Sequence, residues 1–568
     1  MHQPASTPRQ SIYYRYQVFD SPPPPATPGL VPALVVGAGP IGLVTALGLA
    51  QQGVRCVLIE AERQVSEGSR AIVFTRRSME ILQQVGVADA VLAMGLPWRC
   101  GNSFYRGQRV FRMEAPQSDD DRFAPMTNLQ QQYLEEMLLA QVARQPLIEL
   151  RWGHKVIGLP HNQGDHAVLD IDTPHGPYQQ AASWVVAADG ARSALRQLCD
   201  VKLEGNAYEG RFVIADIRID LPLPTERLAF FDPVWNPGNT VLMHREPHGI
   251  WRIDYQLPPD ETPEQALAPA SLAARINAQL AMIGLANTPW ELDWSSVYSA
   301  RALTLPNYVH ERVAFVGDAA HLLPIFGVRG ANTGFQDAQN LAWKLGQVLR
   351  GNAPPALLGS YSHERVAAAR EIIDEAGKST RFMTPPSHGF RLLRDAVLSL
   401  SLSQAFVRPL YHWRTSRPHD YLQSPLNAAD DDNGSLPDGP ANGCPVPNLQ
   451  LARGHHLLDA LCGEGAGPFT LLLAQGQPDA ALLAAVQACQ SEGLPLRLVA
   501  ATAQPPAPRP PGLAAWLHDA DGRLPAHLGL PPTGAVLIRP DQHLCARWQA
   551  PPSASQLTRA LHRALART

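Results

Sequence analysis

Three glycines follow the first apolar segment of the chain. The run "VVGAGPIGLVTALGLAQQGVRCVLIE" places Gly37, Gly39 and Gly42 directly after a predicted strand and at the start of a predicted helix. This spacing allows a tight turn, close approach of the backbone to a pyrophosphate, and close packing of the helix on the strand. Glu60 ends the next predicted strand, where a carboxylate can accept hydrogen bonds from an adenosine ribose. The pattern predicts a dinucleotide site, which by itself fits NAD or FAD.

Two aspartates come directly after two further predicted strands. "WVVAADGARSALR" delivers Asp189, and "RVAFVGDAAH" delivers Asp318. Taken alone, Asp189 could be an ordinary turn or cap residue. Ligands of open α/β sheets lie beyond the carboxyl ends of the strands, so two such acids together with Glu60 indicate one extended ligand.

Composition narrows the class of protein. The chain has 568 residues and a net charge of −4, which fits two or three domains. It has no long Lys or Arg run, so we expect no nucleic-acid partner. No apolar stretch is long enough for a membrane span, and no signal peptide is visible, so we expect a cytoplasmic protein. The seven cysteines form no CxxC pair, which argues against a disulfide framework or a metal site.

The cofactor motifs resemble those of a known family. In order and spacing, "GAGPIG", "AADGARS" and "GDAAHLLP…GANTGFQDAQNLAWKL" resemble the three motifs of the group A flavoprotein monooxygenases. These single-component FAD-dependent aromatic hydroxylases include p-hydroxybenzoate, phenol and hydroxyphenylpropionate hydroxylases. The resemblance runs from about Leu34 to Tyr361. It implies non-covalent FAD in a Rossmann-like α/β domain, with NADH or NADPH as co-substrate.

The resemblance also implies roles for single residues. Glu60 matches the ribose ligand, Arg70 a flavin-contacting arginine, and Gln131 a glutamine near the ribityl chain. Asp189 matches an acid near the pyrophosphate and the pyridine nucleotide route, and Asp318 an acid on the ribityl chain. Arg70 and Gln131 could instead be ordinary surface residues at helix starts. The other cofactor-contacting positions implied are Gly37, Gly39, Pro40, Ile41, Gly42, Val156, Gly317, Pro324, Gly330, Ala331 and Asn332.

The loop after Asp318 leads into a helix predicted to begin near Ala331. A helix start presents free N–H groups and a partial positive charge, so it can stabilise negative charge on a reduced flavin. We expect Gly330 to allow close backbone approach and Asn332 to bond the pyrimidine edge if its side chain turns inward. His321 is expected to pack or cap rather than to react. Arg329 replaces an uncharged residue of the family loop, where it could alter the preference for substrate charge or point to solvent, and we expect it to face solvent.

The implied reaction is hydroxylation of a small phenolic or related aromatic substrate. FAD would be reduced by NADH or NADPH and react with oxygen to a C4a-hydroperoxide, which transfers one oxygen atom, while the protein orients the ring and excludes water. Two alternatives remain open here. One is an FAD oxidoreductase of the same fold that inserts no oxygen, and the other is a flavin-binding protein without turnover.

The loop that follows Asp318 and leads to the helix near Ala331 is called the flavin loop. The substrate is expected between this loop and an inserted antiparallel sheet. Period-two alternation at "RFVIADIRIDL" and "GIWRIDYQL" predicts this sheet. A base that ionises a phenol would make the ring more nucleophilic, and His244 or Asp254 has the right side-chain type. Pro324 matches a family proline near the reactive side of the flavin, and Arg252 falls near a family arginine, although that match is loose. The inner-face candidates are Phe231, Trp235, His244, Trp251, Arg252, Asp254 and Tyr255.

The chain is expected to divide at its Pro- and Gly-rich breaks. Its last part reads as strand, helix, strand, strand, strand and helix, which resembles the thioredoxin-like C-terminal domain of the phenol hydroxylase branch. Without CxxC it cannot perform dithiol chemistry, so we expect a structural role or a role in a homodimer. The predicted parts are a Pro-rich arm (1–33), the FAD-binding domain (34–205 and 296–380), the substrate-binding sheet (206–295), a helical connector (381–426), a linker (427–448) and the thioredoxin-like domain (449–568).

Overall fold

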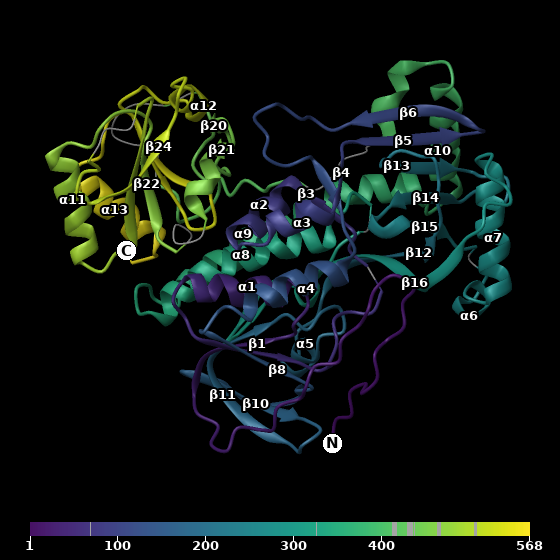
Figure 1. The fold of residues 1–568 in the computed structure, drawn as a ribbon, viewed down its shortest axis with the longest axis horizontal. Coiled ribbons are helices and arrows are strands. Elements are labelled where there is room, and N and C mark those ends of the chain that lie inside the picture. The colour runs from purple at the N-terminus through teal and green to yellow at the C-terminus, as the bar shows by residue number, and fades with distance from the viewer. Residues whose placement is uncertain are drawn as a thin grey trace.

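The computed structural model describes the chain in three packed parts (Figure 1). It covers residues 1–567 except 69, 259, 325, 412–416, 429–435, 437, 463–466 and 505–507. Much of the predicted linker 427–448 therefore lies outside the described residues. Among the residues described, no helix is long and apolar enough to cross a bilayer.

A parallel sheet forms the centre of the first part. Its central strands are largely buried because helices cover the sheet, as parallel sheets require. α1 (Pro40–Gln51) joins the first two strands, which confirms the βαβ unit predicted from Leu34 to Glu60. In sheet order the path runs through β17 (Val309–His310), β18 (Val313–Phe315), β11 (Tyr178–Ala187), β1 (Val31–Val36), β2 (Cys56–Glu60) and β8 (Ile148–Trp152), with β17 antiparallel to β18, and β9 (Lys155–Gln163) and β10 (His166–Asp172) pair beside β11.

Two helices pack closely against each other beside this sheet. α8 (Gly330–Leu349) lies along α1, as Figure 1 shows. The contact is close because small residues line it: a Cβ atom placed at Gly48 would lie 2.7 Å from the Cβ of Ala342. α4 (Gln131–Val142) also packs on α1. α8 is thereby held firmly at the edge where the strands end.

The N-terminal arm lies over this first part. Residues 19–29, the Pro-rich run, form neither helix nor strand, as predicted. Phe19 stacks on Trp152 with ring centroids 4.5 Å apart. Tyr14 and Tyr16 are buried, and Tyr14 meets Tyr133 of α4 edge to face. The arm is therefore packed onto the domain through aromatic side chains.

The second sheet is mainly antiparallel and has eight strands. The prediction placed it within residues 206–295, but two of its strands come from earlier in the chain, one runs beyond residue 295 and one lies wholly beyond it. β5 joins by parallel pairing with β13, a long-range contact that local alternation does not reveal. In sheet order the strands are β19 (His321–Leu322), β16 (Glu291–Thr304), β12 (Glu204–Arg218), β15 (Ile250–Gln256), β14 (Thr240–Arg245), β13 (Arg227–Phe231), β5 (Cys100–Tyr105) and β6 (Gln108–Glu114).

The C-terminal part contains a five-stranded sheet between helices. The strands and helices predicted there are present, with one further strand and one short helix between them. The name thioredoxin-like stays a prediction. In sheet order the strands are β24 (Leu513–His518), β23 (Leu496–Thr502), β22 (Phe469–Leu473), β25 (Ala535–Ile538) and β26 (Leu544–Trp548), and the helices are α11 (Ala480–Ser491), α12 (Leu524–Leu528) and α13 (Ala554–Ala564).

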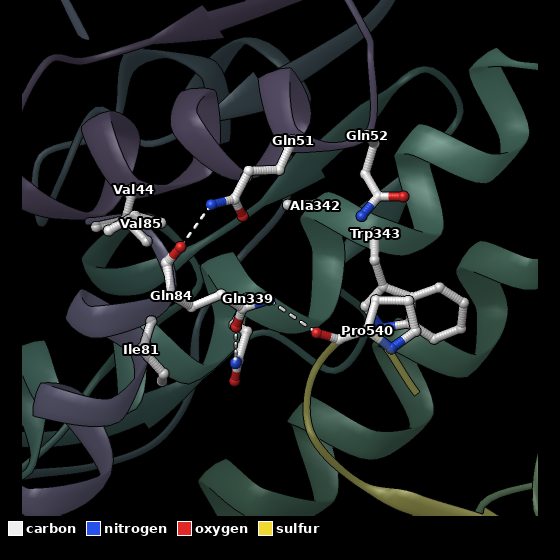
Figure 2. A pocket seen from close by; sticks show the side chains of 11 residues that line it. Val44, Gln51, Gln52, Ile81, Gln84, Val85, Gln339, Ala342, Trp343 and Pro540 are labelled. Atoms are coloured by element: carbon white, nitrogen blue, oxygen red, sulfur yellow. Dashed lines mark hydrogen bonds between the residues drawn. The ribbon is translucent and has the colours of Figure 1, made fainter. Parts of the chain in front are cut away.

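The loop between β25 and β26 inserts against the first part of the molecule. Figure 2 shows Pro540 of this loop next to Trp343 of α8, closing a small pocket between α1, α2 (Arg76–Gln84) and α8. Arg539 donates two hydrogen bonds to Glu364 of α9 (Leu357–Met383), at 2.8 and 2.9 Å. Asp541 accepts from the indole N–H of Trp343 at 2.9 Å. The C-terminal part is therefore joined to α8 and α9 by buried polar contacts.

Buried charges make this junction sensitive to substitution. Lys344 of α8 lies 2.7 Å from Glu364, and both side chains are at most 1% exposed. Despite the cost of burial, Arg539 and Lys344 hold the pKa of Glu364 far below its usual range. Removing one partner of such a group leaves a buried charge without compensation.

We predict that Arg539→Met lowers the free energy of unfolding by about 3–5 kcal/mol, because Glu364 and Asp541 lose their shared guanidinium. The matched control is Arg523→Ala, which breaks the solvent-accessible pair with Asp120 between the same two parts of the molecule. Urea unfolding should show little change in the control. Equal losses in the two variants would contradict a special role for the buried junction.

Candidate active site

The predicted dinucleotide turn has the expected geometry. Gly37 has a φ of +106°, and a Cβ atom there would lie 2.4 Å from the carbonyl oxygen of Ala188. A Cβ atom at Gly42 would lie 1.9 Å from the carbonyl oxygen of Gly37, so neither position accepts a side chain. A Cβ atom at Gly39 meets no protein atom within 4 Å, and no side chain caps the N-terminus of α1, where Pro40 is the first residue. The first turn of α1 therefore presents its backbone donors to open space, as an anion site requires.

Glu60 lies beside this turn. Its carboxylate accepts hydrogen bonds from the backbone N–H of Ala38 at 2.7 Å and of Glu62 at 3.0 Å. Burial raises its pKa, and the two backbone donors oppose that effect. The predicted ribose ligand is thus held next to the glycine turn.

The two predicted aspartates lie on the same edge of the sheet. β11 and β18 are neighbouring parallel strands, and they deliver Asp189 and Asp318 at their carboxyl ends. Asp189 accepts from the backbone N–H of Leu195 at 3.1 Å, while its Oδ1 is buried with no hydrogen-bond partner among the described residues. Such an unsatisfied oxygen is suited to a ligand hydroxyl. The carboxyl ends of β2, β1, β11 and β18 therefore form one continuous polar edge.

Asp318 reaches solvent although protein surrounds it closely. It belongs to a short 3-10 turn (Gly317–Ala319), and its side chain is exposed. Burial by the surrounding protein nevertheless raises its pKa, and His321, Arg70 and Arg196 oppose that rise. Both observations fit a side chain on the open edge formed by Glu60, Asp189, Asp318 and the first turns of α1 and α8, which is called the groove below. The charge of Arg70 acts on Asp318, so these two predicted residues belong to one site.

Gln131 lies next to the segment that carries Arg70. Its Oε1 accepts from the backbone N–H of Ala71 at 3.3 Å, and its Nε2 donates to Glu135 at 2.8 Å. Glu135 in turn accepts from Ser66, so α4 contacts both Ser66 and Ala71. The side chain of Arg70 is exposed, and its charge acts on Asp318.

The first turn of α8 meets the same groove, but the side chain of Asn332 is used elsewhere. Its Oδ1 accepts from the backbone N–H of Thr75 and from the hydroxyl of Ser78, at 2.9 and 2.6 Å. Its Nδ2 donates to the carbonyl oxygens of Val73 and Val328, at 2.9 and 2.7 Å. The prediction that the Asn332 amide bonds the pyrimidine edge of the flavin is therefore wrong. All of the amide's hydrogen-bonding groups instead join α8 to preceding segments of the chain.

The other residues predicted to contact the cofactor are of two kinds. Some leave the backbone accessible, and others pack inside the protein. A Cβ atom at Gly330 would meet nothing within 4 Å, so the helix start is open as predicted. Ile41 packs against Gly317 and Gly334, where it supports the turn. Val156 belongs to the core, with 5% exposure, so its side chain does not face the groove. Pro324 is buried in the loop, and Ala331 is half-buried in the first turn of α8.

His321 has a structural position. It is fully buried, and its Nε2 lies 2.6 Å from Oδ2 of Asp337. Asp337 also accepts from Arg365 at 2.6 Å and from the backbone N–H of Gly317 at 3.1 Å. The sequence reasoning missed Asp337, although an acid inside the apolar run "GANTGFQDAQNLAWKL" was the available signal. These contacts favour the packing role for His321.

Arg329 does not face solvent. It is 2% exposed, and its guanidinium lies 3.8 Å from Oε2 of Glu375 on α9. The expectation of a solvent-facing arginine is wrong because an acid on a helix distant in sequence compensates the buried charge.

The inner face of the second sheet carries a row of charged residues. Arg252 of β15 lies between two residues of the neighbouring strands. In register it pairs with His244 of β14 and with Asp216 of β12. Arg252 donates from Nε and Nη2 to Asp216, both at 2.8 Å, and from Nη1 to the carbonyl oxygen of Arg70 at 3.2 Å. The hydrogen bond to Arg70 connects this row of charged residues to the segment that carries Arg70.

Asp254 occupies the next row of the same face. It is 7% exposed, and its Oδ1 has no hydrogen-bond partner among the described residues. Burial raises its pKa to about 7, opposed by Arg252 and Arg227 and reinforced by Asp216. A carboxyl group with this pKa changes charge near neutral pH. Burial together with Arg227 and Arg252 holds the pKa of His244 well below its usual range, so His244 is neutral.

Three predicted inner-face residues point the other way. Tyr255 and Trp251 pack with Leu272 and Ile276 of α7 (Pro269–Met282), on the far side of the sheet. Trp235 meets Tyr255 edge to face at 5.6 Å. Side chains alternate between the two faces of a strand, so these aromatics cannot share a face with Arg252 and Asp254.

Phe231 does lie on the inner face. It meets Phe382 of α9 edge to face at 5.7 Å. Phe326 of the loop before α8 packs edge to face on Phe212 of the same face, with ring centroids 5.4 Å apart. Through Phe326 the loop packs on this face of the sheet. Because the loop leads directly into α8, the inner face lies close to the first turn of α8.

Several known proteins are similar to this chain in sequence. 3-(3-Hydroxy-phenyl)propionate/3-hydroxycinnamic acid hydroxylase of Mycolicibacterium smegmatis is 31% identical over 377 residues, which are 66% of this chain and 65% of that protein. The enzyme of the same name from Escherichia coli is 30% identical over 375 residues, which are 66% of each chain. The matched part thus spans slightly less than two thirds of these relatives.

Solved structures share the fold. A flavin-dependent monooxygenase, PieE, in complex with FAD and substrate has a TM-score of 0.79 at 23% identity, covering 95% of this chain and all of that one. A ternary complex of aklavinone-11 hydroxylase with FAD and aklavinone has a TM-score of 0.73 at 24% identity, covering 94% and 99%. A model of the FAD binding domain family matches residues 30–376. Because this match spans more than half of the chain and includes the glycine turn and both aspartates, the chain belongs to the FAD binding domain family.

Proposed function

We propose that this protein is an FAD-dependent monooxygenase that uses NADH or NADPH and molecular oxygen to hydroxylate a small phenolic or related aromatic substrate. The observation that carries the proposal is the continuous edge formed by Glu60, Asp189 and Asp318, directly beside an inner sheet face with a titratable carboxyl group. The family match and the hydroxylase names of the curated relatives support it.

The residues of the groove fit FAD. The first turn of α1 would hold the pyrophosphate, Glu60 the adenosine ribose and Asp318 the ribityl chain. The first turn of α8, open at Gly330, would face the flavin ring, with Arg70 beside it. When bound, FAD supplies hydride acceptance and oxygen activation, while the protein supplies orientation and exclusion of water.

Asp254 is our proposed proton acceptor. Its unpartnered Oδ1 lies on the face covered by the flavin loop, and ionisation of a phenol raises the electron density of the ring. Tyr255 is the less suitable candidate because it packs on α7. His244 has a neutral imidazole, but its pKa is too low to hold the phenol proton near neutral pH.

The central experiment measures oxygen uptake together with the product. Substrate-stimulated oxidation of NADH or NADPH by the FAD-loaded protein should consume oxygen and give a product that has gained one oxygen atom. Dehydrogenation or reduction of the substrate without oxygen gain would instead favour the oxidoreductase alternative.

A homodimer is also proposed. Large apolar side chains are exposed on α10 (His388–Ser401) and on the following 3-10 turn (Ala405–Tyr411), among them Leu392, Leu393 and Phe406. Exposed patches of this kind favour association. The mass in solution, measured by light scattering, tests this proposal.

We predict that Gly39→Leu abolishes FAD binding without unfolding the protein. A side chain at this position would meet no protein atom but would fill the space in front of α1. The flavin absorbance per protein should fall to near zero while circular dichroism stays unchanged. Gly359→Ala, at another position where a Cβ atom meets nothing, is the matched control and should keep its flavin. Full flavin content in Gly39→Leu would exclude the proposed pyrophosphate site.

We predict that Asp254→Asn lowers the hydroxylation rate by roughly 10²-fold or more, because the amide cannot accept the phenol proton. In the unchanged protein the rate should fall as the pH drops below about 7, since only the ionised carboxylate is a base. This pH dependence should disappear in the variant. Tyr255→Phe is the control and should keep both the rate and the profile. A variant Asp254→Asn with the original rate would remove Asp254 from the mechanism.

A further inference from the structure

The stretch of chain from residue 61 to residue 70 connects the cofactor edge to the second sheet, and it is called the 61–70 segment below. Glu60, directly before it, is held beside the glycine turn. The charge of Arg70, at its other end, acts on Asp318. The carbonyl oxygen of Arg70 accepts a hydrogen bond from Arg252 of β15 at 3.2 Å. The positions of two residues that the proposed function assigns to FAD therefore depend on this segment.

The 61–70 segment has no helix or strand among its described residues. Its conformation therefore depends on contacts from other parts of the chain. α4 provides one of them, because Glu135 accepts from the backbone N–H and from the hydroxyl of Ser66, both at 2.7 Å. The ring of Trp294 on β16 provides another, since it lies so close to Gly68 that a Cβ atom there would clash with it. Gly68 has a φ of +66°, which also favours glycine.

Arg9 of the N-terminal arm contacts the middle of the segment. Its Nη1 donates to the carbonyl oxygen of Val65 at 2.6 Å, and its backbone N–H donates to Oε1 of Gln64 at 2.8 Å. Gln64 in turn donates from Nε2 to the carbonyl oxygen of Thr7 at 2.9 Å. Nε of Arg9 also lies 3.5 Å from the carboxylate of Glu67. The arm and the segment are thus joined by donors from both sides.

Tyr16 of the arm contacts the part of the segment that leads to Arg70. Its hydroxyl donates to the carbonyl oxygen of Ser66 at 3.2 Å and accepts from the backbone N–H of Gly68 at 3.4 Å. Tyr16 is 6% exposed, and its ring meets that of Tyr14 edge to face with centroids 4.8 Å apart. This packing fixes the hydroxyl, so Tyr16 restrains the backbone shortly before Arg70.

The same arm is anchored to the second sheet. The hydroxyl of Ser11 and the backbone N–H of Ile12 both donate to Oδ1 of Asp293 on β16, at 2.7 and 2.6 Å. Arg218 of β12 donates to the carbonyl oxygen of Ile12 at 3.0 Å. The hydroxyl of Ser11 also accepts from the backbone N–H of Tyr14 at 3.1 Å, which orders the chain between this anchor and the tyrosines. Residues 9–16 therefore bridge the second sheet and the 61–70 segment.

Order in this segment affects the affinity for the cofactor. When only a fraction of the molecules has the binding-competent conformation, the apparent affinity for a ligand falls by that fraction. Ordering a segment without helix or strand costs backbone entropy, and contacts that hold it in place beforehand remove this cost from binding. The family model begins at residue 30, so the arm that supplies these contacts lies outside the matched region.

We propose, on the basis of the FAD site of the proposed function, that the N-terminal arm helps to hold FAD. Ser11 and Tyr16 are positioning residues that bridge the second sheet and the 61–70 segment, and the bridge keeps Glu60 and Arg70 in the conformation that binds the cofactor. This role goes beyond the aromatic packing of the arm, because the loss of a polar contact at either end of the bridge releases the segment.

A pair of tyrosine variants of the full chain tests the end of the bridge at the segment. Tyr16→Phe keeps the ring packing but loses both contacts to the segment, so it should raise the dissociation constant of FAD by roughly 3- to 10-fold, the effect of one net hydrogen bond. Calorimetric titration of the apoprotein with FAD measures it. Tyr14→Phe is the matched control, since that hydroxyl bonds Glu136 of α4, and its affinity should not change. Full affinity in Tyr16→Phe, or an equal loss in the control, overturns the proposal.

A pair of serine variants tests the end of the bridge at the second sheet. Ser11→Ala removes a contact to Asp293 and touches no hydrogen bond of the 61–70 segment, yet it should also weaken FAD binding by roughly 3- to 10-fold. Ser6→Ala is the control, because Ser6 is exposed and its side chain has no hydrogen bond within the described part of the chain. Unchanged FAD affinity in Ser11→Ala contradicts the bridge.

The double variant tests whether the two ends act as one device. Because a break at either end opens the bridge, Tyr16→Phe combined with Ser11→Ala should bind FAD about as weakly as the more affected single variant. If the two single effects multiply in the double variant, the ends act independently and the bridge is wrong.

Hydrogen exchange separates positioning from general stability. In the apoproteins of Tyr16→Phe and Ser11→Ala, the backbone N–H groups of the 61–70 segment should exchange faster, while those of α1 and β1 should be unchanged. Faster exchange in all of these elements would indicate a general loss of stability and would overturn the positioning role.

Failure of this inference and failure of the proposed FAD site give different results. If Gly39→Leu loses its flavin while Tyr16→Phe and Ser11→Ala keep full affinity, the FAD site stands and the role of the arm fails. If Gly39→Leu keeps its flavin while the two arm variants bind FAD weakly, the pyrophosphate assignment fails and the role of the arm stands. Neither result depends on oxygen transfer.

Discussion

The carboxylate of Asp337 holds together the segments on which the cofactor edge depends. It accepts from His321, from Arg365 and from the backbone N–H of Gly317. These contacts join the end of β18, where Asp318 follows, to α8 and α9. A buried carboxylate is stable only with such partners, and here His321 and Arg365 hold its pKa below the usual range despite burial. The position of Asp318 relative to the first turn of α8 therefore follows from one buried acid.

The other end of α8 is held by the C-terminal part. Trp343 and Lys344 lie two turns beyond Asp337. Trp343 meets the loop that carries Arg539 and Asp541, and Lys344 pairs with Glu364, to which Arg539 also donates. This loop also contacts α2 through Arg77, whose guanidinium donates to Gln542 and to the carbonyl oxygen of Asp541. The C-terminal part thus stabilises the helix whose first turn faces the groove, without contributing a redox pair of cysteines.

Alternation of side chains along its strands gives the second sheet one apolar face and one charged face. One face packs aromatic and aliphatic side chains on α7, and the other carries charged groups under the flavin loop. Arg252 and Tyr255 are three positions apart on β15, and this odd spacing places them on opposite faces. The same alternation places Asp254 with Arg252, where burial and the neighbouring Asp216 raise its pKa.

The sequence by itself determined the local features of the cofactor edge. The glycine turn, Glu60 and the two aspartates after strands are set by short-range rules, namely backbone sterics and the geometry of parallel strands, so each could be predicted from its neighbours. The tertiary structure alone decided the partners of buried polar groups. Asn332 bonds residues more than 250 positions away, and Arg329 pairs with a helix that follows later. Such pairings depend on long-range packing, and a buried charge can be assigned a role only when every group around it is known.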